Sequence, residues 1–322
     1  MFRKCIHCRW FCIKSVLFLL ISYRRTCIIC NILGWSVVCR KVGTGREYIE
    51  RTSRIDSFEE TAMVLMRKYL SLSILALLFF LGIVVTALKM WFGIITVLLC
   101  LLFMYVFKTN LRFITSIFIS FIVSLSFFQF INIFILNYNL STEVETLLNR
   151  SLLLIMVLGI WLTHLIHKKK LSFFNRLPEW DTYINLPFHT IKISSFLLVV
   201  FLVNILILSL FIFQQDISDI QSMLFFGLLF SIINATLEEF LWRGILLSSL
   251  TRYVSVLYGM IITSIGFGLM HLVIDMPLLL CIIFSFGGFF YAVLVLKTKS
   301  IYPAVLIHFM INIGMVLSGW IV

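Results

Sequence analysis

The chain has 322 residues, of which 61% are hydrophobic and only 12% are charged. Soluble domains are roughly half apolar and a quarter charged, so this composition excludes a soluble protein and indicates one embedded in lipid. The formal net charge of +12 does not indicate a nucleic-acid partner. The basic residues lie between apolar runs and form no single basic face or tail.

The chain begins with a basic, cysteine-rich stretch, residues 1–62, that holds six of its eight cysteines. Cys5 with Cys8 and Cys27 with Cys30 have the CxxC spacing of structural zinc sites. The apolar residues between the two pairs are not typical of a zinc-binding loop. This N-terminal extension therefore does not predict a zinc site.

Two other interpretations of the same stretch concern how the protein begins. The run Val16 to Ile21 resembles the apolar core of a leader, but no small-residue cleavage site follows it. Alternatively, translation starts at Met63 or Met66, since Met-Arg-Lys before an apolar run is typical of an inner-membrane N-terminus. We expect residues 1–62 to be an extension that is not necessarily translated.

Nine apolar runs follow, and each approaches or exceeds the roughly 20 residues that an α-helix needs to cross a bilayer. The runs are not interrupted by alternating polar residues, which favours helices over the strands of a membrane barrel. We therefore expect an all-α, polytopic transmembrane helical bundle of eight to nine spans, with discontinuous or bent helices around a membrane-embedded cavity. The expected spans are 69–88, 90–107, 112–136, 151–167, 195–214, 222–247, 255–275, 277–296 and 301–321.

The charges of the connecting segments predict the orientation of these spans. Every second connection is basic, whereas the others hold acidic residues such as Glu143 and Asp275, with Lys89 and Arg150 as basic exceptions. By the positive-inside rule, the N-terminus at Met63 is cytoplasmic in a multi-pass cell-membrane protein. The compact length and the bias toward Ile, Phe and Lys favour a bacterial plasma membrane.

The longest connection, 171–191, is aromatic and interrupted by Pro178 and Pro187, which favours a position at the headgroup layer of the membrane. No soluble domain or internal repeat is visible in the sequence. We divide the chain into the extension 1–62, the upstream transmembrane helices 63–221 and a core 222–322 that carries the polar residues described next.

The sixth span contains the charged residues Glu238, Glu239 and Arg243. A charge inside a spanning helix costs at least about 2.5 kcal/mol on insertion scales, so such residues are by default functional or paired. Glu239 and Arg243 are four residues apart, which places them on one helix face as an ion pair. Glu238 lies about 100° around the helix and is left to face a cavity. The simpler alternative is one salt-bridged cluster of all three that holds helices together.

Two later spans add further polar residues at membrane depth. His271 lies in the seventh span, and His308 and Asn312 lie four residues apart in the ninth. A single membrane histidine more often forms a hydrogen bond between helices than it catalyses a reaction. Two histidines, an asparagine and a spare carboxylate on three late helices favour a working site.

These residues resemble the motif set of the CPBP family, which includes CAAX proteases, bacteriocin-processing and immunity proteins, and abortive-infection proteins. The resemblance covers about residues 222–320, where Tyr302-Pro303-Ala304 also resembles the usual entry to the last motif. The three motifs stand here as Glu238-Glu239-x-x-x-Arg243, Phe267-x-x-x-His271 and His308-x-x-x-Asn312.

The resemblance implies an intramembrane endopeptidase, and the chemistry of the residues agrees with it. Peptide hydrolysis needs a base that activates water, and a carboxylate at low dielectric such as Glu238 suits that role. His271 would orient or deprotonate the water. His308 and Asn312 would donate hydrogen bonds to the developing oxyanion.

A metal site is the main alternative for the same side chains. Glu238, His271 and His308 have the donor types of a catalytic zinc site with three protein ligands. No HExxH motif is present, however, and we expect a glutamate-dependent mechanism that needs no cofactor. We also expect the site to face a water-filled cavity that opens toward the cytoplasm. His271 would then lie much deeper in the membrane than His308, which straight helices do not easily reconcile.

Three functions compete at this point. The first is hydrolysis of a membrane-anchored substrate, either a CAAX-like peptide, a bacteriocin precursor or a signal peptide. The second is a non-catalytic bacteriocin self-immunity protein of the same fold. A transporter with a proton relay is disfavoured, because no inverted repeat is visible. The sequence does not specify the substrate, the cleavage position or the oligomeric state.

Overall fold

The computed structural model describes Met66 and residues 68–321, with gaps at 172–173 and 186–189. The elements below belong to one compact unit, Arg67–Val322. The cysteine pairs and the leader-like run of the extension 1–62, and a start at Met63, lie outside the described residues.

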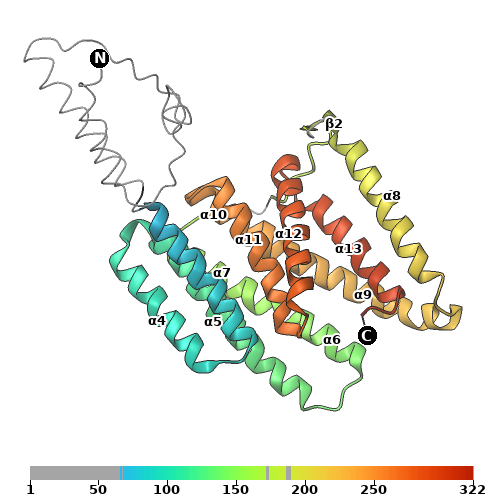
Figure 1. Cartoon of the computed structure of the whole chain (residues 1–322), viewed down its shortest axis with the longest axis horizontal. Helices are drawn as coiled ribbons and strands as arrows, with labels where there is room; N and C mark the ends of the chain where they lie inside the picture. Colours follow the sequence, from blue (N-terminus) through green and yellow to red (C-terminus); the bar gives the residue numbers. More distant parts are fainter. Residues whose placement is uncertain (1–65, 67, 172–173, 186–189, 322) are drawn as a thin grey trace, which may run out of the picture. The chain divides into compact units, whose positions relative to one another are not determined.

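The described residues form nine apolar helices at the positions of the nine predicted spans (Figure 1). Seven are long and apolar enough to cross a membrane, and Trp91–Phe107 and Tyr302–Leu317 are shorter apolar helices. This confirms the prediction of a polytopic helical bundle. The seven long ones are Lys68–Ala87, Thr109–Leu136, Thr142–Ile166, Ile193–Ile212, Ile217–Tyr253, Val256–Ile274 and Leu278–Thr298.

The upstream helices pack around a core of phenylalanine, leucine and isoleucine side chains that extends onto the later helices. The fourth span is divided into two helices, the first of which is capped by Ser141 and carries Glu143 and Glu145 in its first turn and Arg150 in its last. These positions match the polarity of the helix dipole. The elements in chain order are helix Lys68–Ala87, α4 (Trp91–Phe107), η1 (Thr109–Leu111), α5 (Arg112–Leu136), α6 (Thr142–Ser151) and α7 (Leu153–Ile166).

The connection expected at the headgroup layer contains a small antiparallel hairpin that the sequence analysis did not predict. Strand β1 (Tyr183–Asn185) pairs with β2 (Thr190–Lys192), with Tyr183 opposite Lys192. An exposed ion pair of 2.6 Å joins Lys192 Nζ to Asp181 Oδ1, and the hydrogen bond from Lys192, together with its charge, lowers the pKa of the Asp181 carboxyl. A second exposed pair joins Lys299 Nζ to Glu179 Oε1 at 2.9 Å and ties this connection to the end of the eighth span.

The later helices contain the expected discontinuities. A π-helical segment, η2, interrupts the sixth span, and the seventh ends in a 3₁₀ turn, η3. π-Helical segments in α-helices are often found at functional sites. The elements are α8 (Ile193–Ile212), α9 (Ile217–Glu239), η2 (Phe240–Leu247), α10 (Ser248–Tyr253), α11 (Val256–Met270), η3 (His271–Ile274), α12 (Leu278–Thr298) and α13 (Tyr302–Leu317).

Two close helix pairs form the frame of this half, α11 with α12 and α9 with α13 (Figure 1). At Gly268 a Cβ atom would collide with Ser285 and with the backbone of Cys281, so α11 and α12 approach each other too closely for any larger residue. At Gly266 a Cβ atom would lie 2.8 Å from the Trp242 ring. The glycines of the seventh span therefore serve close packing.

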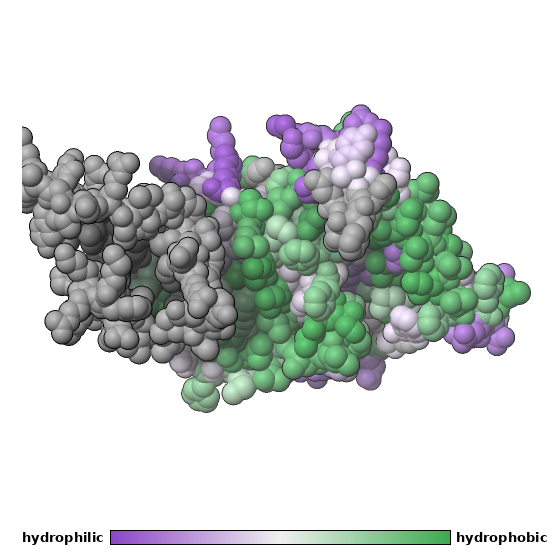
Figure 2. All heavy atoms as spheres, turned by 45° about the horizontal axis from the view of Figure 1, so that its top comes forward, coloured by the Kyte–Doolittle hydropathy of each residue, from purple (hydrophilic) through white to green (hydrophobic). Residues whose placement is uncertain are grey.

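Many large hydrophobic side chains are exposed along the helices, including Phe92, Leu206 and Phe286. Figure 2 shows hydrophobic side chains over the sides of the helices and hydrophilic ones at the upper and lower margins of this view. A soluble monomer rarely exposes apolar surface on this scale, whereas lipid favours it. The chain is a multi-pass membrane protein.

Candidate active site

The ion pair of the sixth span lies at the centre of the later helices. Arg243 Nη1 donates to Glu239 Oε1 at 2.9 Å, and both side chains are completely buried. Arg243 Nη2 donates to the Gly288 carbonyl oxygen at 2.8 Å. The guanidinium carbon lies 4.5 Å from the centroid of Phe267 and 5.1 Å from that of Tyr291, within the range of cation–π contacts. Arg243 thus joins the sixth, seventh and eighth spans.

His308 on α13 lies between the two adjacent glutamates. Its Nδ1 atom is 2.9 Å from Glu239 Oε1, and its Nε2 atom is 3.7 Å from Glu238 Oε2. Because an ionised carboxylate only accepts hydrogen bonds, Nδ1 donates to Glu239. The imidazole also stacks on Tyr291, with centroids 5.3 Å apart and an interplanar angle of 14°. Glu239 therefore orients His308 as well as Arg243.

His271, the first residue of η3, is held by its own helix. Its Nδ1 atom lies 2.9 Å from the Phe267 carbonyl oxygen and donates to it, because a carbonyl only accepts. In the neutral ring this leaves Nε2 as an acceptor. The ring stacks on Phe284 at a centroid distance of 4.2 Å. The backbone contact and the stack together fix the direction in which Nε2 points.

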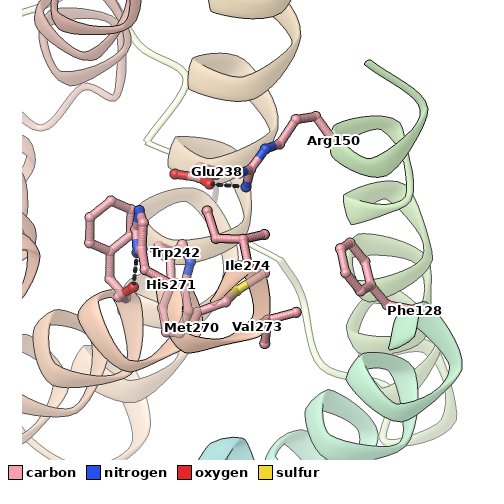
Figure 3. A pocket seen from close by; sticks show the side chains of 9 residues that line it. Phe128, Arg150, Glu238, Trp242, Met270, His271, Val273 and Ile274 are labelled. Carbon is pink, nitrogen blue, oxygen red and sulfur yellow. Dashed lines mark hydrogen bonds and ion pairs between the residues drawn. The ribbon is translucent and has the colours of Figure 1, made fainter. Parts of the chain in front are cut away.

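Glu238 and His271 line the same buried cavity (Figure 3). Its free space is small, about 10 Å³, which is close to the least that one water molecule needs. Arg150 reaches into it from α6 and places Nη1 3.5 Å from Glu238 Oε1. Within the described part of the chain, Glu238 Oε2 accepts no hydrogen bond from a protein group. The other lining residues are Phe128, Trp242, Phe267, Met270, Val273 and Ile274.

The four residues of the predicted working set fall into two groups. Glu238 and His271 line the cavity, whereas His308 and Asn312 lie on α13 outside its lining. The ring of Phe267 contacts both histidines, with centroid distances of 5.1 Å to His271 and 6.0 Å to His308. One aromatic side chain therefore links the two groups.

Asn312 is buried, with an exposed fraction of 5%, and faces the interior of the bundle from α13. Among the described residues, its Nδ2 atom finds no hydrogen-bond partner. Buried amide donors are nearly always paired in proteins, so an unpaired one points to a group that is bound during function. Asn234, one turn before Glu238 on α9, has an unpaired Oδ1 atom among the described residues as well.

Sequence reasoning missed two residues of this site, Arg150 and Tyr291. Arg150 was visible as a basic exception on an acidic connection, and that anomaly was the available signal. Tyr291 is one of many aromatic residues in an apolar span, and nothing in its spacing distinguishes it. Its contacts with His308 and Arg243 arise only when α12 packs beside α13 and η2.

The cavity lies near the acidic connections of the chain. Arg150, Val273 and Ile274 stand beside the acidic connections that contain Glu143 and Asp275. In the orientation that the positive-inside rule predicts, those connections are extracytoplasmic.

The residues suggested as zinc ligands do not gather around one point. No group of three His, Cys, Asp or Glu side chains suited to a metal ion occurs in the described part of the chain. The Nδ1 atoms of His271 and His308 are each engaged in a hydrogen bond, and the ring of Phe267 packs against both imidazole rings. The set Glu238, His271 and His308 therefore does not fit a zinc site, and we derive no step through a metal.

A second hollow lies along α9, which carries Glu238, and α13, which carries His308. This open apolar groove has a volume of about 480 Å³ and is bounded on one side by the hairpin connection. Ser231, on the same face of α9 as Asn234 and Glu238, also lines it. The remaining lining is Leu177, Pro178, Trp180, Ile232, Thr236, Tyr302, Pro303, Val305, Leu306 and Phe309.

The bundle of apolar helices thus places a glutamate and a histidine at one cavity. Residues 220–314 match the sequence model of the family described as type II CAAX prenyl endopeptidase Rce1-like. This region is a domain of the CAAX protease family, and the resemblance seen in the three motifs is confirmed. No curated protein and no solved structure shows significant similarity to the chain.

Proposed function

We propose that the chain is an intramembrane endopeptidase in which Glu238 activates the attacking water with the help of His271. The observation that carries the proposal is that both side chains face one buried cavity. Among the described residues, Glu238 Oε2 accepts no hydrogen bond, and the Phe267 carbonyl oxygen fixes the tautomer of His271. A base within hydrogen-bond reach of water and a second oriented acceptor are what general base catalysis requires.

The hydrolytic step follows from these positions. Glu238 accepts a proton from water while the water oxygen attacks the carbonyl carbon of the scissile peptide bond. The tetrahedral intermediate collapses when the C–N bond breaks, and the proton passes to the leaving amine. The products are a new carboxylate and a new amine.

Donors on α13 would stabilise the intermediate. The unpaired Nδ2 of Asn312 supports a role in binding an oxyanion. His308 can donate from Nε2 only when its ring carries both protons, because Nδ1 already donates to Glu239. Both donors lie behind the cavity lining, so binding of substrate would have to bring the carbonyl oxygen toward α13.

The surroundings of the site support a membrane-associated substrate. The apolar groove along α9 and α13 offers space for the lipid or apolar side chains of such a peptide, next to the helices that carry Glu238 and His308. A CAAX-like peptide and a bacteriocin or signal peptide precursor both have this character.

The test is cleavage by the purified protein in lipid nanodiscs. A peptide that carries a lipid-linked cysteine near its C-terminus is incubated with the protein, and mass spectrometry identifies the fragments. We expect cleavage by the natural protein and by Glu179→Gln, which changes only an exposed ion pair, but none by His271→Ala. Cleavage by His271→Ala at the natural rate would overturn the assignment. Absence of cleavage of all peptides by the natural protein would favour a non-catalytic immunity protein.

A further inference from the structure

We infer that Arg150 binds a free carboxylate of the substrate, namely the C-terminal carboxylate of the peptide that is cut. This inference rests on the proposed endopeptidase function and names its substrate class. Arg150 lies in the last turn of α6, outside the region 220–314 that matches the protease family. Its side chain is 14% exposed, and the guanidinium points into the cavity beside Glu238 (Figure 3).

The contact between Arg150 and Glu238 leaves much of the guanidinium unused. The two groups approach with a single pair of atoms at 3.5 Å, Nη1 and Oε1. The Arg150 Nε atom is buried and has no hydrogen-bond partner among the described residues. The guanidinium carbon also lies 6.0 Å from the ring centroid of Phe230. By contrast, the buried Arg243 donates to Glu239 and to the Gly288 carbonyl at 2.9 and 2.8 Å.

The geometry of a guanidinium explains why a second carboxylate is the ligand that fits. Arginine presents its N–H groups as a planar fork that matches the two oxygens of a carboxylate. Among the described residues that line the cavity, the other polar side-chain groups are Glu238, His271 and the indole N–H of Trp242, so Arg150 is the sole permanent cation there. An anionic chain end that enters the cavity therefore has one cation to bind.

Binding there would have two consequences for hydrolysis. A carboxylate held by Arg150 places the end of the peptide beside Glu238, so the scissile bond lies within a few residues of the C-terminus. It also pairs with the Arg150 guanidinium in place of Glu238. The Glu238 carboxylate is then free to accept a proton from water. Arg150 would thus act as a specificity residue and would couple substrate binding to activation of the base.

The experiment compares two peptides of the same sequence, one ending in a carboxylate and the other in a carboxamide. We expect the natural protein to cleave the carboxylate peptide with a kcat/KM roughly 10- to 100-fold higher, which is typical of a hydrogen bond between charged groups. Arg150→Gln should lose this preference, and Arg150→Lys should retain part of it. The matched control is Arg252→Gln, whose guanidinium donates to the Lys170 carbonyl away from the cavity; it should keep the full preference.

Equal cleavage of the two peptides by the natural protein would overturn the inference and leave the proposed function standing, and this comparison needs no variant to fold. A preference that survives in a folded Arg150→Gln would also overturn it. If neither peptide is cut, the proposed function fails. The inference is then decided by binding of the fluorescently labelled peptides to the natural protein, where equal affinity for the acid and the amide contradicts it.

Discussion

The Nδ1 atom of His308 donates to the same oxygen of Glu239 that accepts from Arg243, each at 2.9 Å. One buried carboxylate oxygen therefore connects α9, η2 and α13. The neighbouring carboxylate of Glu238 is instead in a cavity. Two successive glutamates in one helix thus have different surroundings, and the predictions below follow from that difference.

The first prediction concerns the stability that Glu239 contributes. Glu239→Gln leaves the buried Arg243 without its counter-ion, and breaking a buried pair in this way costs about 3–5 kcal/mol. We expect a clear fall in the thermal unfolding temperature of the protein in detergent.

Glu179→Gln is the control for this change. It removes an ion pair of the same 2.9 Å length, but with side chains 51% and 61% exposed. Exposed pairs contribute at most about 1 kcal/mol, so this variant should unfold close to the natural temperature. Equal loss in the two variants would contradict the structural role of Glu239.

The second prediction concerns the contact between α11 and α12. Gly268→Ala should strongly destabilise the protein, because the new Cβ would collide with Ser285 and the Cys281 backbone. Gly287→Ala is the matched control on the facing helix, since no atom lies within 4 Å of its would-be Cβ. Alanine favours a helix over glycine by roughly 1 kcal/mol, so this variant should be neutral or slightly more stable. Equal unfolding temperatures for the two variants would contradict the close packing of α11 against α12.

The third prediction tests Asn312 as an oxyanion donor. Loss of one such donor lowers kcat by roughly 10²- to 10³-fold elsewhere, and Asn312→Ala should do the same with little change in KM. Asn204→Ala is the control, because Asn204 on α8 donates only to the Val200 carbonyl of its own helix among the described residues. Steady-state kinetics on a fluorogenic peptide measure kcat and KM of both variants. A rise in KM alone would assign Asn312 to substrate binding instead.

The fourth prediction concerns metal dependence. Since Glu238, His271 and His308 do not converge on a point, peptide cleavage should be unchanged after dialysis against a strong chelator. The measurement is the cleavage rate before dialysis, after dialysis and after addition of Zn²⁺. Activity that is lost on dialysis and restored only by Zn²⁺ would contradict the metal-independent mechanism.

The helices and the charged pair were predictable from sequence because each rests on a local signal. Apolar length places the spans, and four-residue spacing places Glu239 beside Arg243. The hairpin at Tyr183 to Lys192 was not predicted, since aromatic and proline residues fit a headgroup loop equally well.

The side-chain contacts between different helices could not be predicted from such local signals. Spacing along one helix shows that Glu238 lies on a different face from Arg243. It does not show that Arg150 approaches Glu238 from a helix about 90 residues earlier in the chain. It also does not show that His308 bonds to Glu239, because that contact depends on how α13 packs against α9. Nor does it reveal that the Phe267 ring contacts both histidines.

The central claim is that Glu238 is the base that activates water, and the cleavage rate of Glu238→Gln under single-turnover conditions tests it most directly. The substitution keeps the size of the side chain and removes its capacity to accept a proton. We predict a fall of roughly 10²- to 10⁴-fold, the usual contribution of a general base, with a thermal unfolding temperature at or above that of Glu239→Gln. A folded Glu238→Gln protein that cleaves its peptide at the natural rate would contradict the account.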